Sequence, residues 1–194
     1  PAPIQKELLR AGYLEGIRID RYERDIQPAV FGLKPNATFA DPAAFDAAII
    51  ARSAEAQRKA LERYLQDSND TASPRAMASL YARLSSGHLL DLQNADLVLD
   101  LMRRTKTGVD RLNAGMRKGW TLAHRGGQSR TMQGMTATFN DTGLATGKSG
   151  GRIALAVFIE GATRPVRELE AFQKSVAATV LEAWEGRTVP GPKS

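Results

Sequence analysis

The chain has 194 residues, of which 42% are hydrophobic and 25% are charged, with a formal net charge of +6 and no cysteine. This length and composition are typical of a soluble globular domain with its own core, and they exclude disulfide and thiolate chemistry. No apolar run approaches the roughly 20 residues of a membrane span, and the arginines are interleaved with acidic residues instead of forming a basic block. We therefore expect neither a membrane span nor a nucleic-acid partner.

The first third of the chain is predicted to contain short helices and loops. Residues 4–11 predict a helix, residues 17–20 a brief extended piece, and residues 21–34, where proline and glycine recur, a loop. The alanine-rich, charged residues 42–66 predict one long helix. Its middle, residues 52–59, has no large apolar side chain, which indicates a surface helix.

Two amphipathic helices are predicted next. The first begins at Ser73-Pro74, an N-cap followed by proline at the first helical position, and ends at Gly87. The second covers residues 94–104. Their inward faces are predicted to carry Met77, Leu80, Tyr81 and Leu84 in the first helix, and Leu97, Val98, Leu101 and Met102 in the second.

After Gly119 the hydrophobic period changes to two, which predicts strands. Strands are expected at residues 120–124 and 130–139, followed by a turn over residues 140–151. Residues 152–159 are apolar on both faces and predict an interior strand covered on both sides.

A long terminal helix completes the predicted elements, and residues 187–194 are expected to form a tail. Its apolar positions are Val166, Leu169, Phe172, Val176, Val180 and Trp184. The predicted order is helices, then three consecutive strands that can form an antiparallel meander, then a helix. This order predicts an α+β fold.

Several short motifs occur in a fixed order along the chain. They are Arg21-Tyr22-Glu23-Arg24-Asp25-Ile26-Gln27, Asp70-Thr71-Ala72-Ser73-Pro74-Arg75-Ala76-Met77, Lys106-Thr107-Gly108-Val109-Asp110-Arg111-Leu112, Gly119-Trp120 and Ala123-His124-Arg125-Gly126-Gly127-Gln128-Ser129. Together they resemble the second half of a class A serine β-lactamase. In that family a loop carries Arg-x-Glu-x-x-x-Asn, a helix opens with Thr-Pro, and a strand beginning with Gly-Trp or Gly-Thr leads into a Lys-Thr/Ser-Gly box.

The resemblance implies a β-lactamase/transpeptidase-like fold, an antiparallel sheet flanked by helices. Residues 1–186 would be the C-terminal portion of one such domain, with a helical insertion at about residues 31–69. The Ser-x-x-Lys and Ser-Asp-Asn motifs of the family do not occur in these 194 residues. The resemblance places both motifs before the position of Pro1, so we expect this chain to need that N-terminal segment as a partner and to be inactive alone.

The resemblance also implies roles for residues in the first loop. Glu23 matches the glutamate that activates water to hydrolyse the acyl-enzyme, and Gln27 matches the Asn that helps hold this water. Arg21 and Asp70 match a salt bridge that joins the two ends of the loop. The alternative for Glu23 is a solvated loop carboxylate among arginines.

The box itself is altered to Arg-Gly-Gly. Arg125 matches the lysine that attracts the substrate carboxylate, and Gly126 replaces the Thr or Ser whose hydroxyl binds that carboxylate. Gln128 would place a backbone N–H in the oxyanion hole, and Ser129 is a candidate to replace the lost hydroxyl. The alternative is a basic β-turn at a strand edge.

Other motif-like stretches are set aside. Lys106-Thr107-Gly108 follows a predicted helix, Gly147-Lys148-Ser149 lacks the context of a phosphate-binding loop, and the two histidines are too far apart in sequence to suggest a metal site.

The predicted activity is that of a class A β-lactamase-like serine hydrolase, which needs no metal or cofactor and acts on a β-lactam or related acyl substrate in the periplasm or outside the cell. The alternatives are a serine hydrolase of a non-lactam substrate, a pseudo-enzyme that binds peptidoglycan-like ligands, and a basic binding module suggested only by charge.

Overall fold

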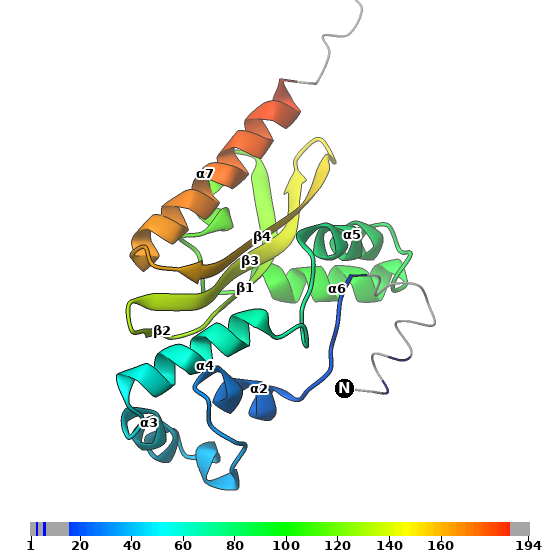
Figure 1. The fold of residues 1–194 in the computed structure, drawn as a ribbon. Coiled ribbons are helices and arrows are strands. Elements are labelled where there is room, and N and C mark those ends of the chain that lie inside the picture. Colours follow the sequence, from blue (N-terminus) through cyan, green and yellow to red (C-terminus); the bar gives the residue numbers. More distant parts are fainter. Residues whose placement is uncertain (1–2, 4–5, 7–15, 187–194) are drawn as a thin grey trace, which may run out of the picture. The chain divides into compact units, whose positions relative to one another are not determined.

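The computed structural model describes residues 16–186 together with residues 3 and 6 (Figure 1). The predicted tail, and all of the predicted helix over residues 4–11 except residue 6, lie outside the described residues. The chain divides into two compact units. The first contains the described residues up to Ser73 with residues 128–138 and 160–163, and the second contains residues 74–127, 139–159 and those from Arg164 onward.

The first unit is mostly helical. Its elements are α2 (Glu23–Val30), the 3-10 helix η1 (Ala37–Ala40), α3 (Pro42–Ile50), α4 (Ala54–Gln66) and a hairpin of β2 (Thr131–Met132) with the first residues of β3 (Met135–Gly147). The hairpin pairs Thr131 with Thr136 and Met132 with Met135. Its turn is Gln133-Gly134, both with positive φ, as a two-residue type I′ turn requires.

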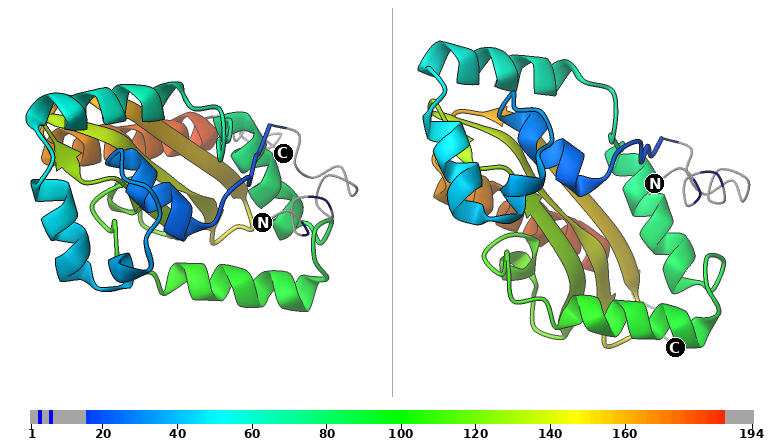
Figure 2. Two further views of the ribbon diagram at one scale, coloured as in Figure 1. Left: turned by 60° about the horizontal axis from the view of Figure 1, so that its bottom comes forward. Right: turned by 90° about the horizontal axis from the view of Figure 1, so that it is seen from below.

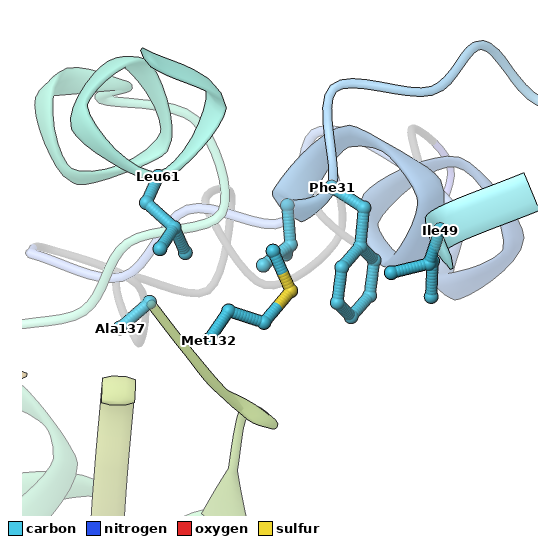
Figure 3. Close-up of a cluster of buried hydrophobic side chains, with 6 residues drawn as sticks. Phe31, Ile49, Leu61, Met132 and Ala137 are labelled. Atoms are coloured by element: carbon cyan, nitrogen blue, oxygen red, sulfur yellow. The ribbon is translucent and has the colours of Figure 1, made fainter. Parts of the chain in front are cut away.

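A cluster of buried apolar side chains holds these elements together. Phe31, Ile49 and Leu61 come from the helical segments, and Met132 and Ala137 come from the hairpin (Figure 3). Leu61 and Ala137 are 1% and 0% exposed, so helix α4 is anchored to the hairpin and not simply laid on the surface.

Two predictions for this unit were wrong. The predicted loop over residues 21–34 contains helix α2, which includes Pro28 in its second turn. The predicted helix over residues 42–66 is broken at residues 51–53, where Ser53 caps α4 by accepting a hydrogen bond from the N–H of Ala56 at 3.2 Å. Serine competes for backbone hydrogen bonds, so it favours a helix start over a helix interior.

The second unit has helices on both faces of a sheet (Figures 1 and 2). Its elements are α5 (Pro74–Ser85), α6 (Leu92–Arg103), the 3-10 helix η2 (Leu112–Gly115), most of β1 (Trp120–Gln128), the rest of β3, most of β4 (Arg152–Ala162) and α7 (Val166–Glu185). Strand β3 is central in the antiparallel sheet, because β1, β2 and β4 all pair with it. No helix among the described residues is long and apolar enough to cross a membrane.

Alternate residues of each strand face the two helical layers. Ala123, Leu144 and Ala154 pack with α5 and α6, whereas their neighbours Leu122, Ala145 and Leu155 pack with α7. Apolar residues therefore lie on both faces of β1, β3 and β4, as the pattern at residues 152–159 predicted. Strand β4 is not an interior strand, however, because among the described strands it pairs with β3 alone.

The predicted turn over residues 140–151 was wrong for most of its length. Strand β3 continues through Asn140-Asp141-Thr142-Gly143 to Gly147, and only residues 148–151 form the turn. Asp141 is fully buried, and a Cβ on Gly143 would lie 2.3 Å from the carbonyl oxygen of Ala123. In this turn-like stretch, Asp141 therefore makes a buried hydrogen bond, and Gly143 allows strands β1 and β3 to approach closely.

The inward faces of two helices also differ from the prediction. In α6, Ala95 and Leu99 are buried, while Leu97 and Leu101 are 57% and 60% exposed. In α7 the buried stripe is Leu169, Gln173, Ala177 and Leu181, while Phe172 and Trp184 are largely exposed. Gln173 is fully buried and donates from Nε2 to the carbonyl oxygen of Phe139 at 3.2 Å, a use of a polar side chain that a hydrophobic pattern does not reveal.

Candidate active site

Helix α2 places Glu23 and Gln27 on one face, since residues four apart are neighbours on a helix. The amide Nε2 of Gln27 donates to Oε1 of Glu23 at 3.4 Å, and both side chains are exposed. Two acidic residues in the first turn, Glu23 and Asp25, interact favourably with the helix dipole. Burial of Pro28 and Val30 at the other end of α2 fixes the helix against the core of the first unit.

A pocket of about 590 Å³ opens beside this pair, entirely within the first unit. Glu23, Gln27 and Arg130 contribute polar groups to it. The remaining lining residues come from α2, from η1 with the residue before it, and from the start of α3: Arg24, Pro28, Asn36, Ala37, Phe39, Ala40, Pro42 and Phe45.

Two arginines border the pocket, and each makes a contact within the first unit. Arg130 forms an ion pair with Asp46 at 2.5 Å. Arg24 lies next to Glu23 in sequence, and its guanidinium stands 4.8 Å from the ring centroid of Tyr22.

The two ends of the segment from Arg21 to Asp70 are joined by ion pairs. Nε of Arg21 lies 2.6 Å from Oδ2 of Asp70, and Nη1 lies 2.8 Å from Asp67. Oδ1 of Asp70 also accepts hydrogen bonds from the backbone N–H groups of Asp20 and Arg21 at 2.7 and 2.9 Å. We call residues 16–21 and 67–73 the neck, because an antiparallel bridge between Ile17 and Ala72 also joins them.

Hydrogen bonds in the neck lower the pKa of three carboxyl groups. Partial burial raises the pKa of Asp70, but the backbone and side chain of Arg21 outweigh it, and the net pKa lies below the usual value. The N–H of Asp70 lowers the pKa of Asp20, and the N–H of Asn69 lowers that of Asp67.

The altered box lies at the end of β1. Arg125 is exposed, and a Cβ on Gly126 would lie 2.7 Å from Nη1 of Arg111 and 3.3 Å from the carbonyl oxygen of Asn140. Arg111 is 6% exposed. Its guanidinium stacks 4.1 Å from the ring centroid of Phe139, and its Nη1 donates to the carbonyl oxygen of Asn140 at 3.1 Å. The cation of Arg111 therefore fills the space beside Gly126, the residue that we predicted to match the hydroxyl-bearing position of the family box.

Gln128 and Ser129 lie in the first unit, whereas Arg125 and Gly126 lie in the second. The hydroxyl of Ser129 accepts a hydrogen bond from the N–H of Thr138 at 3.1 Å. A serine hydroxyl that accepts still has its own proton to donate.

A buried histidine–aspartate pair lies directly before the box. Nδ1 of His124 is 2.9 Å from Oδ1 of Asp141, and these side chains are 2% and 0% exposed. Asp141 also accepts from the N–H of Leu112 at 3.2 Å, which ties the segment carrying Arg111 to β3. His88, by contrast, bonds the nearby hydroxyl of Ser86, and no cluster of three potential metal ligands occurs among residues 16–186.

Residues 32–184 match the model of a family described as "Beta-lactamase enzyme family". The chain belongs to this β-lactamase family. Among curated proteins, it is 33% identical over 90 residues to β-lactamase VEB-1 of Pseudomonas aeruginosa, a match that covers 45% of this chain and 30% of that protein. It is 30% identical over 96 residues to a β-lactamase of Streptomyces cellulosae, covering 50% of this chain and 30% of the relative.

Solved β-lactamases share the fold. A β-lactamase of Chitinophaga pinensis superposes with a TM-score of 0.68 at 20% identity, covering 94% of this chain and 55% of that structure. A class A β-lactamase of Bacteroides cellulosilyticus gives 0.67 at 14% identity, covering 95% of this chain and 54% of the other. These structures confirm the predicted fold, and the match to the family model confirms the predicted family. The chain spans about half the length of the structures that it matches.

Sequence reasoning did not single out Arg111 or the His124–Asp141 pair. Arg111 lies in a quoted motif, but its proximity to Gly126 depends on the turn before η2. His124 was considered as a possible metal ligand and was set aside. No local signal indicated the pair, because residue 141 stands in a stretch with the composition of a turn and its partner His124 lies on another strand.

Proposed function

We propose that the protein containing this chain is a serine β-lactamase and that this chain supplies its deacylating base. The observation that carries the proposal is the Glu23–Gln27 pair on α2 beside a pocket, in a chain of the β-lactamase family. The serine nucleophile would come from a part of the same fold outside these 194 residues, since neither Ser-x-x-Lys nor Ser-Asp-Asn occurs here.

The proposed reaction has two steps. The serine hydroxyl oxygen attacks the lactam carbonyl carbon, the ring C–N bond breaks, and the ring nitrogen takes a proton. Glu23 then removes a proton from a water that Gln27 helps to hold, and this water attacks the ester carbonyl. The proton passes to the serine oxygen as the ester bond breaks, which releases the opened product.

The residues of the altered box would bind the substrate. Arg125 would attract the carboxylate of the lactam, the backbone N–H of Gln128 would contribute to the oxyanion hole, and Ser129 would offer a hydroxyl. The proposed location is the periplasm or the outside of the cell, as is typical of class A β-lactamases.

A second candidate is a related protein that binds or acylates without hydrolysing β-lactams. The observation in its favour is Gly126, where the hydroxyl of the family is lost and Arg111 occupies the space. Such a protein would act on a non-lactam acyl substrate or bind a peptidoglycan-like ligand.

The test uses the complete gene product with nitrocefin and a fluorescent penicillin. Turnover of nitrocefin together with transient labelling is the expected result. Stable labelling without turnover would reject the hydrolytic role of Glu23 and favour the second candidate. Absence of both would reject the lactam substrate. The 194-residue chain alone is expected to show neither labelling nor turnover.

A further inference from the structure

A second pocket lies within the first unit, between the chain that follows α2 and one face of α4. Its volume is about 330 Å³, and it shares no lining residue with the pocket beside Glu23. It is lined by Ala29, Gly32, Leu33, Lys34, Ala60, Arg63, Tyr64 and Asp67. Most of this lining belongs to residues 31–69, the segment that we predicted to be an insertion relative to the family.

We propose that this second pocket is a binding site for a small dianion of the phosphate-monoester class. The inference goes beyond the proposed function and does not depend on it, since no residue of the proposed catalytic machinery lines this pocket. It gives the inserted segment a ligand of its own.

Hydrogen bonds fix the backbone of the chain that follows α2. The N–H of Gly32 donates to the carbonyl oxygen of Ala29, and the N–H of Leu33 donates to that of Pro28, both at 2.9 Å. These two bonds, with a φ of 68° at Gly32, form the Schellman motif that ends many helices. Two carbonyl groups at the end of α2 are therefore engaged within the chain, and Lys34 extends from a defined backbone.

Helix α4 forms the other side of the pocket. Its lining residues are spaced by three or four positions and therefore share one face: Ala60, Arg63, Tyr64 and Asp67. A Cβ on Gly32 would lie 2.8 Å from Cβ of Ala60, so glycine lets the chain lie directly against the helix. Leu33 and Tyr64 pack against the buried apolar cluster of the first unit, which supports both sides of the pocket.

Two cations of the lining have no carboxylate partner in the part of the chain that the structure describes. Lys34 and Arg63 are both exposed and are free to turn toward a ligand. The acidic lining residue, Asp67, is already engaged, because its Oδ2 pairs with Arg21 at 2.8 Å and its Oδ1 accepts from the N–H of Asn69 at 3.0 Å. An anion with two negative charges can pair with both free cations at once.

Arg52 and Tyr64 add to the attraction for an anion. Nη2 of Arg52 would lie 3.1 Å from a Cβ on Gly32, and Nε of Arg52 is buried with no hydrogen-bond partner among residues 16–186. A third positive charge therefore stands next to a residue of the lining. Burial raises the pKa of the Tyr64 hydroxyl, which keeps its proton and can donate it in a hydrogen bond.

The size and composition of the pocket suit a phosphate monoester. Arginine and lysine are the usual side chains that bind phosphate, arginine through its planar fork and lysine as a point charge. A volume of about 330 Å³ is at the lower end of the range of about 300–1,000 Å³ for small-molecule sites. Ala29, Leu33 and Ala60 offer apolar surface to the group that carries the phosphate.

Calorimetric titration of the complete gene product with phenyl phosphate, at about pH 7.5 where a phosphate monoester is a dianion, tests the inference. We expect saturable binding that Lys34→Gln and Arg63→Gln each weaken by about tenfold or more, the loss of one charge-assisted hydrogen bond. Arg58→Gln is the matched control, because Arg58 is exposed on α4 and does not line the pocket. It should leave the Kd within about twofold. Equal weakening in all three variants, or no saturable binding to the wild type, would overturn the inference.

Phenylacetate tests the charge of the ligand. It carries the same ring with a single negative charge, so it can pair with only one of the two cations and should bind at least about tenfold more weakly than phenyl phosphate. Equal affinity for the two ligands would reject the dianion class.

Sedimentation with lipid vesicles separates a soluble ester from a lipid headgroup. Vesicles of phosphatidylcholine with phosphatidic acid present a phosphate monoester, and vesicles of phosphatidylcholine alone do not. Binding to the first kind that Arg63→Gln reduces and Arg58→Gln retains supports the pocket with a headgroup as its ligand. Binding of phenyl phosphate without sedimentation supports it with a soluble ester. Sedimentation that both variants reduce equally would reflect general surface charge and would contradict a headgroup site in this pocket.

Discussion

Arg111 and Gly126 form a matched pair of residues. Because glycine at position 126 has no Cβ, it leaves room for the guanidinium of Arg111, which stacks on Phe139 and donates to the carbonyl oxygen of Asn140. The absence of a side chain at position 126 and the position of this buried cation therefore depend on each other.

Restoring a hydroxyl at position 126 should destabilise the protein. In Gly126→Ser the new Cβ would lie 2.7 Å from Nη1 of Arg111 and 3.3 Å from the carbonyl oxygen of Asn140, so the guanidinium must shift in a buried site. We expect a loss of about 1–3 kcal/mol in the free energy of unfolding, as for other overpacked sites. Gly127→Ser is the control, because nothing lies within 4 Å of a Cβ there. Equal denaturant midpoints for both variants would contradict the paired arrangement of Arg111 and Gly126.

At the scale of elements, ion pairs and a β-bridge together join the two chain segments of the neck, at the two ends of the helical segment between them. Asp70 has a φ of 53°, and its Oδ1 accepts hydrogen bonds from the backbone N–H groups of Asp20 and Arg21. Its carboxylate thus fixes the backbone at residues 20 and 21 and also pairs with the guanidinium of Arg21. Asparagine also adopts this left-handed backbone conformation, so Asp70→Asn removes the charge without straining the backbone.

Asp70→Asn should lower stability near neutral pH by about 1–3 kcal/mol, the usual cost of losing a charged hydrogen-bond acceptor. Because the folded-state pKa of Asp70 is lowered, its contribution is complete above its unfolded pKa and disappears as the pH falls through the folded value. The gap between wild type and variant should hence narrow below about pH 4. Thermal unfolding from pH 7 to pH 2 measures it.

The exposed residue Asp110 offers a control for this pH series. Asp110→Asn should leave the unfolding temperature nearly unchanged at pH 7. A gap for Asp70→Asn that stays constant down to pH 2 would contradict the ionic role of Asp70.

Elements with a clear period or a local signal were predictable from sequence. The start of α5 at Ser73-Pro74 and the two-sided burial of β4 followed from capping chemistry and from apolar residues on both faces. Strand β3 was cut short in the prediction, because Asn140-Asp141-Thr142-Gly143 has the composition of a turn. Its polar atoms are satisfied by residues distant in sequence, such as His124 and Tyr81, and no local pattern contains that information.

The residues of the candidate site were likewise predictable from the sequence only in part. Glu23, Gln27, Arg21 and Asp70 were named from an ordered set of motifs, and the structure places the first two side by side and the last two in an ion pair. The pocket wall was not foreseen. Phe39 and Phe45 come from a segment with no counterpart in those motifs, and their approach depends on the break between η1 and α3.

On the scale of the whole molecule, α6 exposes a row of leucines. Leu92, Leu97 and Leu101 are 57–62% exposed, while Ala95 and Leu99 fix the other face of the helix in the core. Leu97 and Leu101 are four residues apart and therefore neighbours on the helix surface, and exposed apolar side chains of this kind favour association with another protein surface.

The 194-residue chain should accordingly self-associate as its concentration rises. Replacing Leu97 and Leu101 together by glutamate should reduce the mean mass measured by light scattering without lowering the unfolding temperature by more than a few degrees, since both side chains are exposed. Gln93→Glu adds charge to α6 without removing a leucine and should not reduce association. A monomeric wild-type chain at all concentrations would contradict this prediction.

The central claim is that Glu23 activates the water that releases the acyl group. Intact-protein mass spectrometry of the complete gene product with benzylpenicillin tests it directly, by following the covalent adduct over time. We expect a short-lived adduct in the wild type and one that persists about 10²–10⁴ times longer in Glu23→Gln, the usual range for loss of a general base. Asp25→Asn, on the same helix, should clear its adduct at the wild-type rate. An adduct that clears equally fast in Glu23→Gln, or no adduct in any of the proteins, would contradict the claim.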